Sequence, residues 1–484
     1  MKQINQISIK ELTLDELTLY LETGDLTSVE LVKGYLERIA AFDQAGPSIN
    51  SVLEVNPEAL FIAKKMDFER SNGKIRGPLH GVPVIIKDNI DTADQMHTSA
   101  GSLALQNHYA EKDAFIVKKL RDAGAIILGK ANMTEWANFM AYDMPSGYSS
   151  RGGQVLNPYG PGIHDVSGSS SGSAAAVACN FTMLAVGTET AGSILCPAGN
   201  NNIVGIKPTV GLVSRTGIIP ISISQDTAGP MARNVKDAAR LLEVLAGYDD
   251  GDAATHSATI LHSYTDGLEN ATLKGKRIGI SYQFCIRDLN DKQKSVFDES
   301  LALLKTKGAE IIYLDQISPL ENENFNYKVL LHEFKSGINN YLKTVSPALG
   351  IRTLSDIIEY NNRHQENCLL HNQELLIESD QTDGKLTSAA YLNARLNDLR
   401  SSQDDGIDLV MKDHQLDALI SPNDVWYGIP AKAGYPSISV PSGFDDNGLP
   451  LSIILTAGAF SEKKLIEIAY AYEQITQHRV PIKY

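Results

Sequence analysis

Residues 167–173 read Ser-Gly-Ser-Ser-Ser-Gly-Ser, and they run directly into the apolar stretch Ala-Ala-Ala-Val-Ala at 174–178. A Gly/Ser run of this kind is typical of a flexible linker. Linkers are seldom followed at once by an apolar helix and a buried strand, which we expect here at 174–181 and 184–186. The segment is therefore interpreted as a tight turn that presents hydroxyl and N–H groups at the start of a helix.

A second glycine-rich turn follows that strand and reads Gly187-Thr188-Glu189-Thr190-Ala191-Gly192-Ser193-Ile194. Small residues in front of a serine allow several backbone N–H groups to converge on one point, which is what a developing oxyanion requires. This turn alone does not identify an activity, because such turns also occur without a catalytic role.

A hydroxyl nucleophile needs a base, which is usually a histidine supported by a carboxylate. The chain has 11 histidines, and the nearest to these turns, His164, falls in a Gly/Pro-containing stretch that predicts a surface loop. Lysine can replace histidine where burial lowers its pKa toward neutrality, because desolvation disfavours the ammonium form. Lys87 ends the apolar run Val82–Ile86, so two interpretations stay open: a solvated lysine after a strand, or a buried base.

Helical and strand patterns alternate over nearly the whole sequence, which predicts an α/β protein with a large, mostly buried sheet. Helices are expected at 27–43, 114–123, 174–181, 235–245, 292–305 and 461–476, and mainly helical structure at about 320–405. Strands are expected at 82–86, 125–128, 184–186, 277–280, 310–314, 418–420, 437–440 and 451–455.

The sequence shows no internal repeat and no linker strong enough to divide it, so residues 1–484 are expected to form a single domain. The segments that carry chemistry fall within 80–245. The stretch from about 255 to 410 is more polar and is interpreted as a variable, mainly helical insertion.

The composition is that of a soluble globular protein, with 43% hydrophobic and 21% charged residues among 484. A formal net charge of −15 argues against nucleic acid or an anionic membrane as a partner, because both require a positive footprint. No apolar run is long enough to span a bilayer. The N-terminus has Lys2 followed by polar residues and no apolar signal-peptide core, so a cytoplasmic location is expected unless a leader has been removed.

No cofactor or metal ion is expected from the sequence. The four cysteines are far apart and form no CxxC pair, which disfavours a zinc site and a disulfide framework and predicts buried free thiols. Gly124–Lys130 fits the first seven positions of a phosphate-binding loop. Ala131 lacks the hydroxyl that would bind magnesium, however, and the intervening residues predict a strand, so nucleotide binding is not expected.

Five segments, in this order, resemble those of the amidase signature hydrolases. They are the lysine strand Gly81–Asp88, the Gly/Ser loop Gly168–Ala174, the nucleophile turn Gly187–Pro197, and the following segments Gly205–Thr209 and Asp226–Arg233. The resemblance runs from about Leu26 to the final helix and is weakest between about 255 and 410. It implies one mixed, twisted sheet covered by helices.

The resemblance also implies a role for each residue of the site. Lys87 would be the base, Ser169 a bridging serine and Ser193 the nucleophile, with the 24-residue spacing between the serines that the family has. The Gly168–Ser169 peptide bond would be cis, and Ser170 would support the hydrogen-bond network. The oxyanion hole would consist of four backbone N–H groups, those of Thr190, Ala191, Gly192 and Ser193.

The implied function is hydrolysis of a carboxamide C–N bond through a serine acyl-enzyme. Leu195 stands where amidotransferase-like members carry Arg, Ala191 replaces a common Gly, and Glu189 replaces a common Asp. With the stretches 151–154, 157–159 and 196–198, these departures resemble the peptide amidases, which remove the C-terminal amide of peptides. Loss of the Arg charge would also disfavour a small anionic substrate such as glutamine. Trp136, Ala137 and Tyr142 are candidate pocket residues, with core packing as the alternative.

Several alternatives remain at this stage. The chain could be the glutaminase component of a tRNA-dependent amidotransferase, a fatty or aryl amide hydrolase, or an inactive binding paralogue. The complete Lys/Ser/Ser set argues against the last. The expected partner is a small-molecule or peptide amide substrate, and the chain is expected to be a monomer or a homodimer.

Overall fold

A large mixed β-sheet organises the computed structural model, which describes residues 7–323 and 325–483. Eleven strands follow one another across the sheet in the order β1-β3-β2-β6-β8-β7-β12-β13-β11-β9-β10. A separate two-stranded sheet pairs β4 with β5. The strands are β1 (Val52–Val55), β2 (Pro83–Lys87), β3 (Ile126–Ala131), β4 (Tyr148–Ser149), β5 (Gly153–Gln154), β6 (Leu184–Glu189), β7 (Val204–Lys207), β8 (Thr227–Ala232), β9 (Arg277–Ile280), β10 (Glu310–Tyr313), β11 (Ala418–Pro422), β12 (Ser437–Phe444) and β13 (Pro450–Thr456).

Parallel and antiparallel pairs both occur in the large sheet. Strand β2 pairs in parallel with β3 and β6, and β9 pairs in parallel with β10 and β11. The strands between these two groups, from β6 through β8, β7, β12 and β13 to β11, pair in antiparallel fashion. The expected α/β fold with one large mixed sheet is confirmed.

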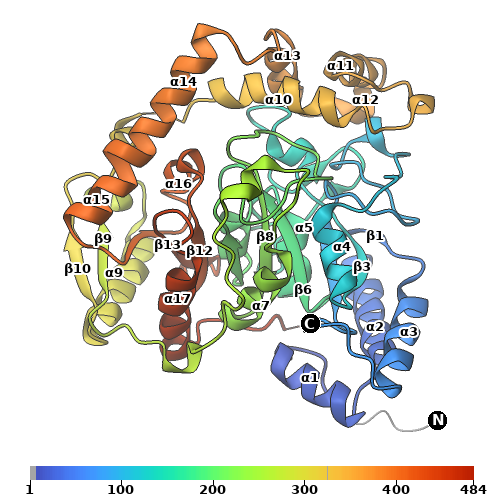
Figure 1. Cartoon of the computed structure of the whole chain (residues 1–484), viewed down its shortest axis with the longest axis horizontal. Coiled ribbons are helices and arrows are strands. Elements are labelled where there is room, and N and C mark those ends of the chain that lie inside the picture. Colours follow the sequence, from blue (N-terminus) through green and yellow to red (C-terminus); the bar gives the residue numbers. More distant parts are fainter. Residues whose placement is uncertain (1–6, 324, 484) are drawn as a thin grey trace.

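Helices cover the sheet and one of its ends. In Figure 1, α10, α11, α13 and α14 lie together above the end of the sheet at the top of the view. The helices are α1 (Leu14–Thr23), α2 (Ser28–Arg38), α3 (Ala59–Ser71), α4 (Phe115–Asp122), α5 (Ser171–Ala178), α6 (Leu195–Asn200), α7 (Val235–Leu245), α8 (Tyr282–Ile286), α9 (Asp291–Thr306), α10 (Lys328–Tyr341), α11 (Leu354–Arg363), α12 (Gln365–Cys368), α13 (Glu374–Asp380), α14 (Ala389–Leu399), α15 (Asp408–Asp413), α16 (Gly428–Ala433) and α17 (Glu462–Thr476).

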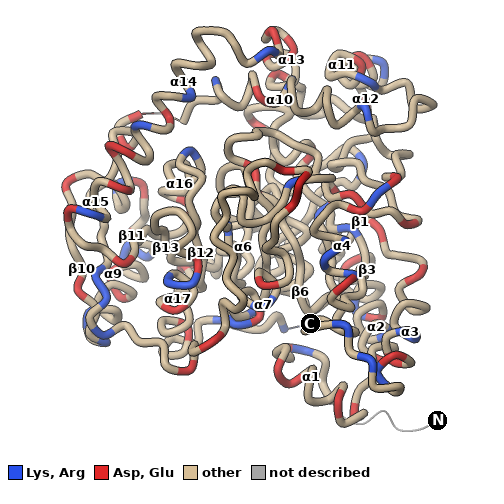
Figure 2. Tube along the Cα trace, viewed as in Figure 1, with Lys and Arg blue, Asp and Glu red and all other residues tan. Residues whose placement is uncertain are grey.

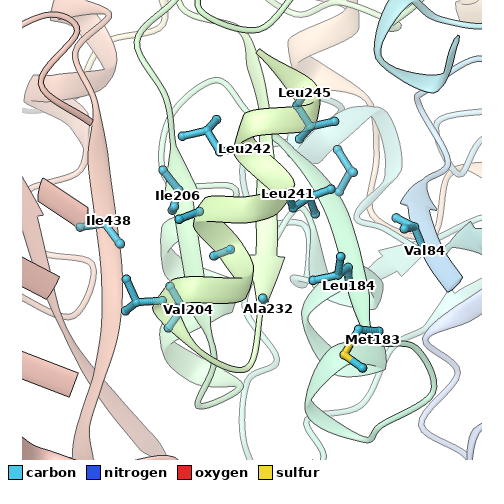
Figure 3. Close-up of a cluster of buried hydrophobic side chains, with 14 of the residues drawn as sticks. Val84, Met183, Leu184, Val204, Ile206, Ala232, Leu241, Leu242, Leu245 and Ile438 are labelled. Carbon is cyan, nitrogen blue, oxygen red and sulfur yellow. The ribbon is translucent and has the colours of Figure 1, made fainter. Parts of the chain in front are cut away.

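Helix α7 shows how sequence pattern becomes packing. Its side chains Leu241, Leu242 and Leu245 are fully buried and lie against strand residues such as Ile206 and Leu184 (Figure 3). Apolar residues three and four positions apart share one face of a helix, so this spacing buries a continuous stripe. The helix has the bounds expected from the sequence.

Most expected elements are present with shifted ends. The capping box of Thr27 and Glu30 starts α2 as expected, but α2 ends at Arg38 and a π-helical turn, Ile39–Asp43, replaces its last part. The helix expected at 174–181 begins earlier, at Ser171, so the Gly/Ser segment forms its first turn.

The stretch from about 255 to 410 contributes both to the large sheet and to the helices that cover it. Its strands β9 and β10 form one end of the large sheet, while α10 to α14 supply the helices above the sheet. Its interpretation as a variable insertion stays a prediction.

Charged residues are spread over the surface elements, with Lys and Arg among Asp and Glu (Figure 2). All four cysteines are free and buried. Across residues 7–323 and 325–483, none of the helices has both the length and the apolar character needed to cross a bilayer. The sequence-based prediction that the N-terminus has no signal-peptide core rests partly on Lys2 and its neighbours, which lie outside the described residues.

Candidate active site

Lys87 is the last residue of β2, and its side chain is fully buried. Its Nζ atom lies 2.7 Å from Ser169 Oγ, 3.0 Å from Ser170 Oγ and 3.1 Å from the carbonyl oxygen of Thr188. The apolar run that precedes Lys87 forms a strand inside the sheet, between β3 and β6, and this position removes the lysine from water. Of the two interpretations left open by the sequence, the structure therefore supports the buried lysine.

Burial lowers the pKa of Lys87 to about 7, because desolvation disfavours the charged ammonium. The carboxylates of Glu189 and Asp226 act in the opposite direction and keep this pKa from falling further. A lysine with a pKa near 7 is partly neutral at physiological pH and is able to accept a proton.

The Gly/Ser segment places two hydroxyls against this lysine. The Gly168–Ser169 peptide bond is cis, as expected, and the Ser169 carbonyl accepts a hydrogen bond from the Thr134 N–H. Ser170 Oγ lies 3.0 Å from the Thr188 carbonyl and accepts a hydrogen bond from the Thr188 N–H. Ser170 therefore joins Lys87 to the start of the second turn.

The second turn follows β6 and is held by a buried carboxylate. Glu189 accepts hydrogen bonds from the backbone N–H groups of Gly192, Ile194 and Leu195 at 2.7–3.0 Å. Ser193, which is 7% exposed, accepts a hydrogen bond from the Ser170 N–H at its carbonyl oxygen. This contact links the two turns, while the Ser193 hydroxyl bonds to no group among the described residues.

Three of the four expected oxyanion donors are free. The N–H groups of Thr190, Ala191 and Ser193 have no hydrogen-bond acceptor in the described part of the chain. The N–H of Gly192 donates to Glu189 Oε1 at 2.8 Å. The expectation that Gly192 adds a fourth donor does not agree with this contact, because the Glu189 carboxylate already occupies that N–H.

Two residues ahead of β8 hold Thr190 and were given no role from the sequence. Asp226 accepts a hydrogen bond from the Thr190 hydroxyl at 2.5 Å, and Gln225 donates one to the Thr190 carbonyl at 3.2 Å. The motif Asp226–Arg233 marked this place in the sequence. The contact itself depends on the pairing of β6 with β8, which no local signal reveals.

A cavity of about 920 Å³ reaches the second turn. Thr188, Glu189, Thr190 and Asp226 line it, together with residues of α10. Of the three candidate pocket residues, Ala137 lines this cavity.

The other two candidate pocket residues lie elsewhere. Trp136 is buried in an apolar cluster that includes Phe139 and Phe334, so core packing accounts for it. Tyr142 is 48% exposed, donates a hydrogen bond to Glu378 at 2.7 Å, and packs against the ring of Tyr327.

Leu195 and Arg151 belong to the stretches that resemble the peptide amidases, and both lie close to the site. Leu195 is fully buried at the start of α6, directly after the second turn. Arg151 forms an ion pair with Glu54 at 3.0 Å and lies 3.5 Å from Asp88, the residue after Lys87. It therefore supports the strand end that carries the lysine.

The structure offers no phosphate-binding loop at 124–130. Residues 126–131 form β3, and Lys130 is fully buried, with its ammonium donating to the Ile90 carbonyl and the Thr98 hydroxyl. Within residues 7–323 and 325–483, His, Cys, Asp and Glu form no group of three or more that could hold a metal ion.

Comparison with known proteins identifies the family. A family model described as Amidase matches residues 30–466. A probable amidase of Arabidopsis thaliana is 40% identical over 99% of this chain and 92% of that protein. A glutamyl-tRNA(Gln) amidotransferase subunit from Symbiobacterium thermophilum is 33% identical over 94% of this chain and 95% of that protein.

The solved structures agree with this result. The native peptide amidase from Stenotrophomonas maltophilia is 45% identical to this chain, with a TM-score of 0.92, over 98% of this chain and 99% of that one. The buried lysine, the two serine-bearing turns and these similarities lead to one conclusion: the chain belongs to the amidase signature family and is an amide-hydrolysing enzyme.

Proposed function

We propose that this enzyme hydrolyses its substrate through an acyl-enzyme on Ser193, with Ser169 as the bridging serine and Lys87 as the base. The observation that carries the proposal is the buried contact between Lys87 Nζ and Ser169 Oγ at 2.7 Å, next to the turn that bears Ser193. A buried lysine with a lowered pKa, bonded to a hydroxyl, is the arrangement that a lysine base requires.

The reaction follows as a proton relay. Neutral Lys87 takes a proton from Ser169, and Ser169 takes one from Ser193 as Ser193 Oγ attacks the amide carbonyl. When the C–N bond breaks, the relay returns a proton to the leaving nitrogen, which departs as ammonia. Water then attacks the ester through the same groups, and the carboxylic acid and free Ser193 are released.

The negative charge on the carbonyl oxygen needs donors that are already in place. The N–H groups of Thr190, Ala191 and Ser193 are the groups we assign to it, because each is free of other acceptors among the described residues. Glu189 contributes by holding Gly192, Ile194 and Leu195 in the turn and so fixing the direction of the free groups.

We further propose that the substrate is the C-terminal carboxamide of a peptide. The similarity to the Stenotrophomonas maltophilia peptide amidase supports this substrate class. The 920 Å³ cavity is lined by Thr190 and Glu189 of the second turn, though not by Ser193 itself, and its volume is within the range of sites that hold molecules larger than a free amino acid. The whole chain would act as one domain, since its sheet joins β1 near the N-terminus to β13 near the C-terminus.

Mass spectrometry of an amidated peptide after incubation tests this substrate. We expect the peptide to gain the mass difference between –OH and –NH2, with every internal peptide bond intact. Free peptide acids of the same sequence should remain unchanged. Cleavage of internal bonds, or no reaction with peptide amides of varied sequence, would contradict the proposal.

One alternative has an observation in its favour. The 33% identity to the Symbiobacterium thermophilum amidotransferase protein keeps a glutaminase role as the second candidate. Measuring ammonia release from free glutamine, a peptide amide, a fatty amide and an aryl amide at equal concentration separates the candidates. A clear preference for glutamine or for the fatty or aryl amide would replace the peptide as the substrate.

A further inference from the structure

Asp226 forms a bridge between two segments of the site. Its Oδ1 atom accepts the hydrogen bond from the Thr190 hydroxyl at 2.5 Å, and its Oδ2 atom accepts the N–H groups of Ile221 and Ser222, each at 2.8 Å. With Gln225 on the Thr190 carbonyl, Thr190 is held at both of its oxygen atoms while its N–H remains free.

We propose that Asp226 is a positioning residue for amide hydrolysis: it fixes Thr190 so that the free N–H meets the oxyanion, and it places a negative charge near Lys87. The inference rests on the proposed function, since it needs Thr190 as an oxyanion donor and Lys87 as the base. Asp226 lines the cavity proposed for the substrate, but it bonds neither to the reacting amide group nor to Ser193. It acts on the reaction through Thr190 and Lys87.

The geometry explains why a carboxylate is needed here. A backbone N–H stabilises an oxyanion only if it points at the place where the charge develops, and a free turn would lose that direction. An aspartate offers two oxygens, which here accept three hydrogen bonds from two different segments. Asparagine could supply one acceptor oxygen. Its NH2 group would face one of the groups that donate to Asp226, and it cannot accept a hydrogen bond.

The charges around Lys87 come from two elements. Glu189 ends β6 and Asp226 precedes β8, and both raise the pKa of Lys87 against the effect of burial. Lys207 of β7 lies near Glu189, and Arg215 lies near Asp226, so each carboxylate has a cationic neighbour. Burial raises the pKa of Asp226 to about 6, which leaves it mostly ionised where Lys87 titrates.

Helices α10 and α14, above the end of the sheet, hold the segment 221–226 that contains Asp226. Glu333 of α10 accepts hydrogen bonds from the Ser222 hydroxyl at 2.5 Å and from the Ser224 N–H at 3.0 Å. Its other oxygen accepts the Tyr391 hydroxyl of α14 at 2.8 Å. A continuous set of hydrogen bonds therefore runs from α14 through Glu333, Ser222 and Asp226 to Thr190.

The test compares three variants of the full chain with the wild type. Asp226→Asn removes the charge and disturbs the bridge, while Thr190→Val removes only the hydroxyl contact. Asp43→Asn is the matched control, because Asp43 is also a buried aspartate that accepts two backbone N–H groups and a hydroxyl, those of Ser51 and Val52. For each variant, kcat, KM, the pH profile and the melting temperature are measured on a peptide amide.

We expect Asp226→Asn to lower kcat about 10- to 100-fold with little change in KM, a loss below that of removing an oxyanion donor outright. The acidic limb of the pH profile should move to lower pH, since a group that raises the pKa of Lys87 is gone. Thr190→Val should lower kcat without moving the limb. Asp43→Asn should lower the melting temperature and leave both kcat and the limb unchanged.

A wild-type kcat and an unmoved limb in Asp226→Asn would overturn the proposal, as would the same kinetic changes in Asp43→Asn. If Asp226→Asn does not fold, a wild-type kcat in Thr190→Val overturns it, and a reduced kcat with an unmoved limb supports it. Ser193→Ala is assayed alongside: if this variant is active, the proposed function fails, whereas an inactive Ser193→Ala with normal Asp226→Asn kinetics contradicts only the positioning role.

Discussion

The Nζ atom of Lys87 lies 2.7 Å from the Oγ atom of Ser169, and both side chains are fully buried. These residues are 82 positions apart in the sequence, and they meet because β2 and β6 are neighbouring parallel strands with the Gly/Ser segment at their ends. In the proposed mechanism the same contact serves as the first step of proton transfer, with Ser169 donating to the neutral amine.

Replacement of the proposed nucleophile should abolish turnover. We expect Ser193→Ala to lower the rate of ammonia release from a peptide amide by several orders of magnitude, because the attacking oxygen is absent. Ser173→Ala is the control, since Ser173 is a buried serine of α5 whose hydroxyl donates to the Val186 carbonyl, away from the Lys87 contact. A purified Ser193→Ala enzyme with near-wild-type turnover would refute the assignment.

The pH dependence of kcat/KM should show one acidic limb with a midpoint near 7. Lys87 has a pKa of about 7, so it is protonated and inactive as a base below this pH and becomes neutral as the pH rises. The rate should therefore increase with pH through this range. Lys87→Met should lose most activity, and its residual rate should lack this limb. A variant that keeps the limb would place the base on another residue.

The buried lysine should also cost stability. Its pKa is about 7 in the folded protein and near 10.5 when exposed, so the unfolded chain binds more protons between these values. This cost is absent above pH 10.5, where lysine is neutral in both states, and it grows as the pH falls toward 7. At about 1.4 kcal/mol per pKa unit the cost below pH 7 is roughly 4–5 kcal/mol, as an upper bound.

Lys87→Met should accordingly raise the free energy of unfolding, most strongly below pH 7 and hardly at all above pH 10.5. Urea denaturation at several pH values measures this difference. A Lys87→Met protein less stable than the wild type at pH 6 would contradict the pKa assigned to the lysine.

A methyl group at Gly192 should disable the nucleophile turn. Gly192 has a φ of +80°, and a Cβ atom there would lie 2.8 Å from Cys196 Sγ and 2.9 Å from Tyr427 Cδ2. The turn would have to move, and with it Ser193. We expect Gly192→Ala to lower kcat at least about 10-fold, since small displacements of reacting groups are costly.

Gly24→Ala is the matched control for this substitution, because Gly24 has a φ of +76° but no atom within 4 Å of a Cβ. Gly24→Ala should show only the strain of a non-glycine residue at positive φ, as a lower melting temperature with unchanged kcat. If both variants keep wild-type kcat, the turn tolerates a Cβ at Gly192, and a fixed turn is not required for activity.

The resemblance to the amidase signature hydrolases predicted the residues around Lys87 but not the hydrogen bonds of the carboxylates that hold the second turn. Strand β2 is a continuous apolar run and helix α7 has apolar residues at helical spacing, and the sequence predicted both. Strand β8, by contrast, reads Thr-Ala-Gly-Pro-Met-Ala, with a glycine and a proline in the middle of the sheet. Local propensity argues against a strand there, and pairing with β6 and β7 overrides it.

The segment Asp226–Arg233 was recognised in the sequence, but the contact of Asp226 with Thr190 was not predicted, because it exists only when β6 and β8 lie side by side. Leu195 shows a second limit of sequence patterns. The sequence places it next to the nucleophile turn, but only the start of α6 at this residue shows that its side chain is buried in the interior. Distance along the chain is a poor guide to which side chains face a site.

The most direct test of the mechanism is to trap the acyl-enzyme. A slowly hydrolysed peptide amide is mixed with the enzyme, the reaction is quenched in acid during turnover, and the digested protein is analysed by mass spectrometry. We expect an added acyl group on the peptide that contains Ser193, and none in Ser193→Ala or Lys87→Met. An acyl group on Ser169, Ser170 or another residue, or equal labelling in Ser193→Ala, would contradict it.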